Sequence, residues 1–133
     1  MNRLLACVLA TSILGHSIPG EAHHSFAAEF DRDRSITVTG TVDRLEWTNP
    51  HARLYVNGTD ETGKTQLWDF ELGPPNGLMR NGWSRTSLKN GHKVTVSGFR
   101  SKTSTIVANA RTVTLADGRQ VFAGSSFDTG SGQ

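Results

Sequence analysis

The stretch SITVTGTVDRLEWTNPH, residues 35–51, contains the longest β pattern of the chain and the turn that ends it. From Ile36 to Val42, apolar residues alternate with threonines, which is the period-two pattern of a strand with one buried face. Gly40 within this pattern indicates a bend or a bulge. The alternation changes phase after Val42, so we expect a bulge near residues 43–44.

The end of this stretch, Glu46-Trp47-Thr48-Asn49-Pro50-His51, places a carboxylate, an indole and an imidazole within six residues. Pro50 has no N–H and disfavours the helical region for Asn49, which predicts a corner between two strands. Residues 52–57 alternate again and predict a second strand. A polar hairpin connection over residues 58–64 then leads to a third strand over residues 66–72.

Beyond the third strand, the Gly/Pro segment at residues 73–75 stops the sheet. Asn76 is expected to cap a short helix, and Trp83 is expected to pack back on the core. Alternating segments predict further strands over residues 94–99, 108–115 and 119–122.

The order of these elements predicts an all-β fold, a small OB-like barrel of five to six strands with one short helix between the third and fourth strands. An immunoglobulin-like sandwich is the alternative that the alternation alone permits. The expected organisation is a signal peptide over residues 1–22, an N-terminal arm over 23–34, the OB-like barrel over 35–122 and a disordered tail over 123–133. The arm is expected to lay the rings of Phe26 and Phe30 on the domain.

The first residues have the features of a secretory signal. A charged start, Met1-Asn2-Arg3, is followed by a short apolar run and by small residues that predict cleavage after Ala22. The apolar run is too short and too interrupted to remain as a membrane span. We therefore expect a periplasmic or secreted protein. Its single cysteine, Cys7, leaves with the signal, which excludes disulfides, thiolate metal sites and cysteine nucleophiles from the mature chain.

The charge balance and the motif content exclude several classes of protein. A net charge of +2 is too small to indicate binding to nucleic acid. The chain has no nucleophile elbow, no H-E-x-x-H and no phosphate-cradling glycine loop, so we expect a binding or accessory protein and not an enzyme. We expect a monomer whose partner is a protein, a glycan or a peptide.

Several segments resemble a bacterial family of small exported proteins, domain of unknown function 6152. They include His23-His24-Ser25-Phe26 at the expected mature start, the corner Glu46-Trp47-Thr48-Asn49-Pro50-His51 and Phe70-Glu71-Leu72-Gly73. The likeness continues through residues 88–91, 94–98 and 108–111 and so covers almost the whole mature chain. The resemblance implies an exported single domain and implies no activity.

Histidines at the mature start and at the corner point to a metal site. Cleavage after Ala22 would place an α-amino group beside the imidazoles of His23 and His24, and His51 could complete a nitrogen site. Cleavage after Glu21 would instead make His24 the third residue, which also suits square-planar coordination. The first outcome favours Cu(II) over Ni(II) or Zn(II), and the second favours Cu(II) or Ni(II). Glu46 is the expected fourth ligand or the partner that orients His51. The alternative is that these histidines are solvated and that His51 only fixes the corner.

A second hypothesis is ligand binding by the barrel itself. OB-type barrels bind oligosaccharides or oligonucleotides across their second and third strands with the help of stacked aromatic side chains. Tyr55 and Trp68 are the candidate stacking residues, with Arg53 beside them. Trp68 shares parity with Phe70, which makes core packing the alternative for its ring. A protein-interaction module without a metal is the third hypothesis.

Overall fold

The computed structural model describes residues 26–124. The expected signal peptide, His23, His24 and most of the expected tail lie outside the described residues. The fold is mainly an antiparallel β-sheet, so the all-β prediction is confirmed. Its elements are β1 (Phe30–Glu46), β2 (Arg53–Asp60), β3 (Thr65–Glu71), α2 (Pro75–Arg80), β4 (Lys93–Ser101), β5 (Val107–Leu115) and β6 (Gln120–Phe122). No helix within the described residues is long and apolar enough to cross a membrane.

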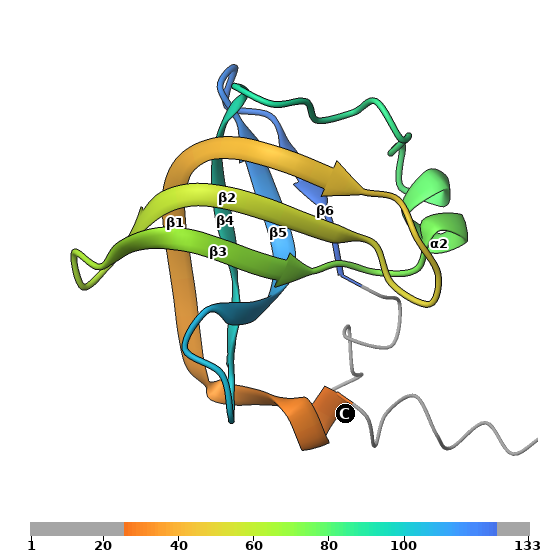
Figure 1. Ribbon diagram of the computed structural model, residues 1–133. Coiled ribbons are helices and arrows are strands. Elements are labelled where there is room, and N and C mark those ends of the chain that lie inside the picture. Colours follow the sequence, from red (N-terminus) through yellow and green to blue (C-terminus); the bar gives the residue numbers. More distant parts are fainter. Residues whose placement is uncertain (1–25, 125–133) are drawn as a thin grey trace, which may run out of the picture.

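The six strands pair in the order β3-β2-β1-β4-β5-β6, and β3 also pairs with β5. The β3–β5 pairing is parallel and the others are antiparallel. The pairings among β1 to β5 therefore form a closed ring. In Figure 1, β1 curves over the molecule, and β2 and β3 run side by side across it. The helix α2 lies at the end where β3 finishes.

The long strand β1 connects the two halves of the ring, because its residues 38–41 pair with β2 on one side and with β4 on the other. The predicted bulge is confirmed by a register shift between Val42 and Arg44. Gly40 is opposite Gly58, and a Cβ on Gly40 would lie 2.2 Å from the carbonyl oxygen of Asn57. Glycine is required there because the two backbones approach too closely for any side chain.

The core is formed by the inward sides of the strands, as the alternation predicts. Trp68, Phe70 and Leu72 are each at most 1% exposed. The indole nitrogen of Trp68 donates a 3.1 Å hydrogen bond to the Gly58 carbonyl, so the buried N–H is satisfied. Trp83 is buried after α2 and donates to the Phe122 carbonyl at 2.9 Å, which confirms its expected packing on the core.

Three local predictions differ from the structure. The helix cap at Asn76 is wrong, because α2 begins at Pro75 with Pro74 as its N-cap and no side-chain cap hydrogen bond. Proline suits the first helical position, occupied by Pro75, because its fixed φ matches the helix and an N–H at this position would have no partner within the helix. β1 begins at Phe30, five residues earlier than expected, so part of the expected arm is strand. Ala123, placed in the tail, is buried and hydrogen-bonded to Gly73 and Arg111.

The start of the described chain packs as expected. Phe26 and Phe30 are buried, with their ring centroids 5.4 Å apart. The ring of Phe26 also meets Phe99 edge-on at 6.2 Å. These contacts attach the beginning of the described chain to β4, at the lower side of the ring in Figure 1.

Candidate functional site at the strand corner

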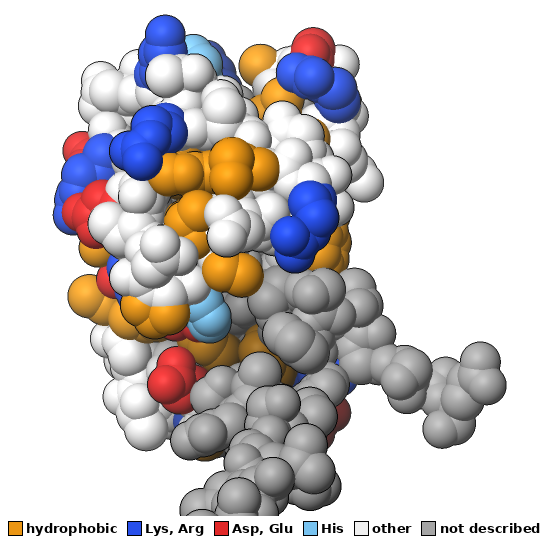
Figure 2. All heavy atoms as spheres, turned by 90° about the vertical axis from the view of Figure 1, so that its right-hand side faces the viewer, with side chains coloured by type: hydrophobic (Ala, Val, Ile, Leu, Met, Phe, Trp, Pro, Cys, Tyr) orange, Lys and Arg blue, Asp and Glu red, His pale blue; other side chains and the backbone are white. Residues whose placement is uncertain are grey.

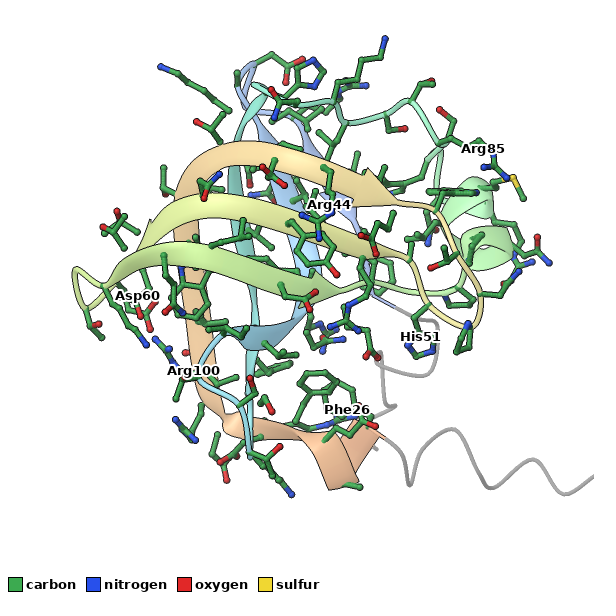
Figure 3. All side chains as sticks on the ribbon, in the orientation of Figure 1. Phe26, Arg44, His51, Asp60, Arg85 and Arg100 are labelled. Carbon is green, nitrogen blue, oxygen red and sulfur yellow. The ribbon has the colours of Figure 1, made fainter. Side chains whose placement is uncertain are left out.

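The corner between β1 and β2 is attached to the end of β3. The Asn49–Pro50 peptide bond in this turn is cis. Immediately after the turn, the Ala52 amide donates to the Gly73 carbonyl at 3.2 Å, and the Leu72 amide donates to the Ala52 carbonyl at 2.9 Å. These two bonds extend the β2–β3 pairing past its last strand residues, so His51 lies beside β3. Figure 3 shows His51 on this turn, and Figure 2 shows the same end of the molecule, where charged side chains are scattered around hydrophobic ones.

His51 is paired with Glu71. The Nδ1 atom of His51 lies 2.5 Å from the Oε1 atom of Glu71, and their side chains are 38% and 15% exposed. Arg53 is directly opposite Glu71 in the β2–β3 register. His51 lies two residues before Arg53 on the same side of the sheet and is therefore the diagonal neighbour of Glu71. The contact fixes the orientation of the imidazole. It also engages the Nδ1 atom of the ring.

Arg53 connects two carboxylates on the outer side of β3. Its Nε and Nη2 atoms each donate to a separate oxygen of Asp69 at 2.8 Å. Its Nη1 atom lies 3.6 Å from the Oε2 atom of Glu71. The hydrogen bonds that Arg53 donates to Asp69 raise the pKa of the Arg53 guanidinium, against the opposing effect of burial. Arg53 therefore remains charged and holds Glu71 in the position from which it contacts His51.

A second group of side chains extends the same outer surface onto β1. The Cζ atom of Arg44 lies 3.5 Å from the centroid of the Tyr55 ring. Arg44 donates to Glu46 at 2.9 Å and to Asp43 at 2.8 Å. These bonds, Glu46 first, raise the pKa of the Arg44 guanidinium. The Tyr55 hydroxyl also donates to Glu46, at 3.4 Å. Glu46 is thus occupied by Arg44 and Tyr55.

Comparison with known sequences places the chain in a family. Residues 10–109 match the Family of unknown function (DUF6152). The chain belongs to this family. No match was found among curated proteins or among solved structures. The matched range includes the corner and the third strand, so the His51–Glu71 pair lies within the family region. The family carries no assigned activity, and the chemistry of this DUF6152 protein must be argued from its own side chains.

The predicted metal ligands are only partly brought together. His23 and His24 lie outside the described residues. Glu46 contacts Arg44 and Tyr55, while Glu71 contacts His51. Within residues 26–124, no three His, Cys, Asp or Glu side chains are grouped so that they could hold a metal ion. The corner thus offers one oriented imidazole, and a complete site needs ligands from elsewhere in the chain.

The residues predicted to stack on a ligand are used inside the fold. Trp68 is 1% exposed and belongs to the core, which confirms the packing alternative. One face of the Tyr55 ring is covered by the guanidinium of Arg44. Arg53 is bound to Asp69 through two hydrogen bonds. The outer surface of β2 and β3 is therefore a network of ion pairs and does not carry an uncovered pair of aromatic rings.

Sequence reasoning missed the two carboxylates that organise the corner, Asp69 and Glu71. Both alternate along β3 with the buried Trp68 and Phe70. The signal that could have identified their roles is the register, because an antiparallel pair with Arg53 opposite Glu71 puts both acids within reach of residues 51 and 53.

Proposed function

We propose that this DUF6152 protein is an exported binding protein with an OB-type barrel that holds a divalent metal, Cu(II) in the first place, between its chain start and the corner. The closed order of strand pairing and the helix between β3 and β4 support the barrel. The predicted signal sequence supports export.

The hydrogen bond between His51 and Glu71 carries the metal proposal. A metal-bound histidine usually donates its other ring N–H to a carboxylate or a carbonyl, which fixes the ring and increases the basicity of the ligating nitrogen. In this protein, Glu71 is itself held by Arg53. The imidazole of His51 thus has the support that a ligand needs, with Nε2 as the coordinating atom.

The remaining ligands in the proposal are the α-amino group and the imidazoles of His23 and His24. A nitrogen-rich site without thiolates suits Cu(II), with Ni(II) and Zn(II) as weaker competitors. The closely placed carboxylates Glu71 and Asp69 are held by His51 and Arg53, so the expected coordination is through nitrogen and not through oxygen.

Calorimetric titration of the processed, metal-free protein with Cu(II) tests this function. We expect one equivalent to bind, and we expect His51→Ala to weaken binding at least tenfold. Glu71→Gln keeps the size of the side chain and removes its charge, and should weaken binding about 10- to 100-fold because it disturbs the orientation of His51.

The matched control is His92→Ala. His92 is an exposed histidine of the turn before β4, and its ring accepts only a 3.4 Å bond from the Lys89 amide among the hydrogen bonds of the described residues. Its removal should leave Cu(II) affinity unchanged. Equal affinities for the His51→Ala variant, the His92→Ala variant and the unmodified protein would refute the participation of the corner. A protein that takes up no Cu(II) would refute the metal function as a whole.

A further inference from the structure

A basic pocket lies at the opposite end of the β2–β3 hairpin from the corner. It has a volume of about 210 Å³ and is bordered by β1, by β3 and by the loop between β4 and β5. Four of its lining side chains are cationic: Arg34, Lys64, Arg100 and Lys102. No acidic side chain of the described part of the chain lines it. Figure 3 shows Arg100 beside Asp60 at this end, far along the sheet from His51.

The positive charge of the pocket is only partly compensated. Arg100 donates to Asp60 at 2.9 Å and to Glu61 at 2.7 Å, and neither carboxylate is among the lining residues. Lys102 donates to the neutral carbonyl of Ala27 at 2.5 Å.

Arg34 and Lys64 take part in no salt bridge within residues 26–124. Counting the four lining cations against Asp60 and Glu61 leaves two positive charges around one small space. An anion with two negative charges would balance them.

The last residue of β4 and the loop that follows it contribute hydroxyl groups that are held in place. The Ser101 hydroxyl accepts hydrogen bonds from the amides of Thr103 at 3.2 Å and Ser104 at 3.1 Å. The Ser104 hydroxyl accepts from the amides of Ile106 and Val107 at 3.3 Å. A serine oxygen that accepts in this way keeps its O–H as a donor. The loop therefore presents fixed hydroxyl donors beside the cations.

Trp68 provides a rigid apolar wall. Its indole is held in the core by the hydrogen bond to Gly58, and Trp68 is one of the residues that line the pocket. The Nζ atom of Lys64 lies 5.9 Å from the ring centroid, and the Cζ atom of Arg100 lies 5.8 Å from it. Both cations are thus placed around one fixed surface. The volume is below the roughly 300–1,000 Å³ of sites for drug-sized ligands, so the space suits a single small anionic group.

We propose that this pocket binds a doubly charged oxyanion, the phosphate or sulfate group of a small molecule. Lysine acts as a point charge towards such groups, arginine adds directed N–H donors, and the serine hydroxyls reach further oxygens. A single carboxylate offers one charge and two oxygens and leaves part of this donor set unused. The proposal is independent of the metal site, because the two sites share no residue.

Isothermal titration of the processed protein in a low-salt, phosphate-free buffer tests the proposal. The probes are inorganic phosphate, inorganic sulfate, glucose 6-phosphate and, as the singly charged comparison, acetate. We expect at least one of the doubly charged probes to bind at least tenfold more tightly than acetate, and we expect this binding to weaken with added salt. The order of the three doubly charged probes identifies whether a phosphate or a sulfate group is preferred.

Two charge-matched double variants separate the pocket from general charge. Arg34→Gln/Lys64→Gln removes two pocket cations that form no ion pair in the described part of the chain, and should weaken binding at least tenfold. Arg85→Gln/Lys89→Gln removes the same charge from exposed positions outside the pocket and should change affinity less than twofold. Figure 3 shows Arg85 near α2, at the other end of the molecule.

Amide chemical shifts locate the bound anion. They should change upon titration mainly at Lys64 and at residues 101–105. Four outcomes would overturn the proposal: no binding of any doubly charged probe at millimolar concentration, acetate binding as tightly, equal weakening in both double variants, or shift changes centred elsewhere.

Discussion

The two ends of the β2–β3 hairpin use similar groups for different purposes. At the turn end, the Asp60 side chain is 1% exposed. It accepts hydrogen bonds from the Thr62 hydroxyl, from the amides of Thr62 and Lys64, and from Arg100. At the corner end, Glu71 is 15% exposed and supports His51, which is 38% exposed. The turn-end carboxylate is enclosed and stabilises the fold. The corner carboxylate orients a side chain that reaches the solvent, which is the arrangement that a binding site requires.

The largest effect on stability is expected at the turn end. Asp60→Asn replaces a carboxylate that accepts four hydrogen bonds, and it leaves the Arg100 charge without its buried partner. We expect the midpoint of thermal unfolding to fall by on the order of 10 °C or more. Asp69→Asn, at the corner end, is the matched variant and should lower it by less than half as much. An equal fall of the unfolding midpoint in the two variants would show that the carboxylate at the turn end stabilises the fold no more than the one at the corner end.

The pH dependence of stability sharpens the same contrast. The Thr62 hydroxyl, the Arg100 guanidinium and the amides of Lys64 and Thr62 hold the pKa of Asp60 well below its usual value, although burial opposes them. The folded state therefore binds fewer protons than the unfolded state, and the stabilisation is complete above the unfolded pKa of about 4. It should be lost as the pH falls below 4.

Thermal unfolding measured between pH 2 and pH 7 checks this expectation. The unmodified protein should lose stability steeply below about pH 4. Asp60→Asn should show a shallower decline, because its neutral amide has no proton to gain. A decline of equal slope in both proteins would contradict the assignment of this effect to Asp60.

A smaller effect is expected for the ion pair at the corner. A double-mutant cycle on Arg53 and Asp69 should give a coupling free energy of about 1 kcal/mol, since the pair is bidentate and half-buried. The control cycle is Arg119 with Asp117, whose atoms are 3.8 Å apart with side chains 68% and 64% exposed. That pair should show a coupling near zero. Indistinguishable couplings would mean that the corner network contributes no more than an ordinary surface pair.

The smallest effect on stability is expected for His51→Ala. The imidazole is partly exposed, and Glu71 keeps Arg53 as a neighbour when the ring is removed. We expect the unfolding midpoint to change by no more than about 3 °C. A drop as large as that of Asp60→Asn would indicate that His51 has mainly a structural role.

Much of the fold could be predicted because a strand with one buried face leaves a period-two pattern. That pattern placed Trp68 and Phe70 in the core and located the bulge after Val42. The start of β1 was missed because residues 31–35 are polar and exposed or nearly so, and they leave no alternation to detect. The β3–β5 pairing that closes the ring involves residues far apart in the sequence, and no local pattern encodes it.

The candidate site was predicted in part. His51 was identified because it directly follows a proline turn in a six-residue segment that also contains a carboxylate and an indole. Its contact with Glu71 was not predicted, because that contact depends on the register of β2 against β3. The basic pocket was missed because Arg34, Lys64 and Lys102 come from three separate segments that only the closed ring brings together.

The central claim is that an imidazole oriented by Glu71 coordinates a metal together with the chain start. Pulsed electron paramagnetic resonance of Cu(II) bound to the processed protein measures the coupling to the remote imidazole nitrogen directly. We expect the signal of one coordinated imidazole to disappear in His51→Ala and to persist in His92→Ala. A spectrum that His51→Ala leaves unchanged would contradict this claim.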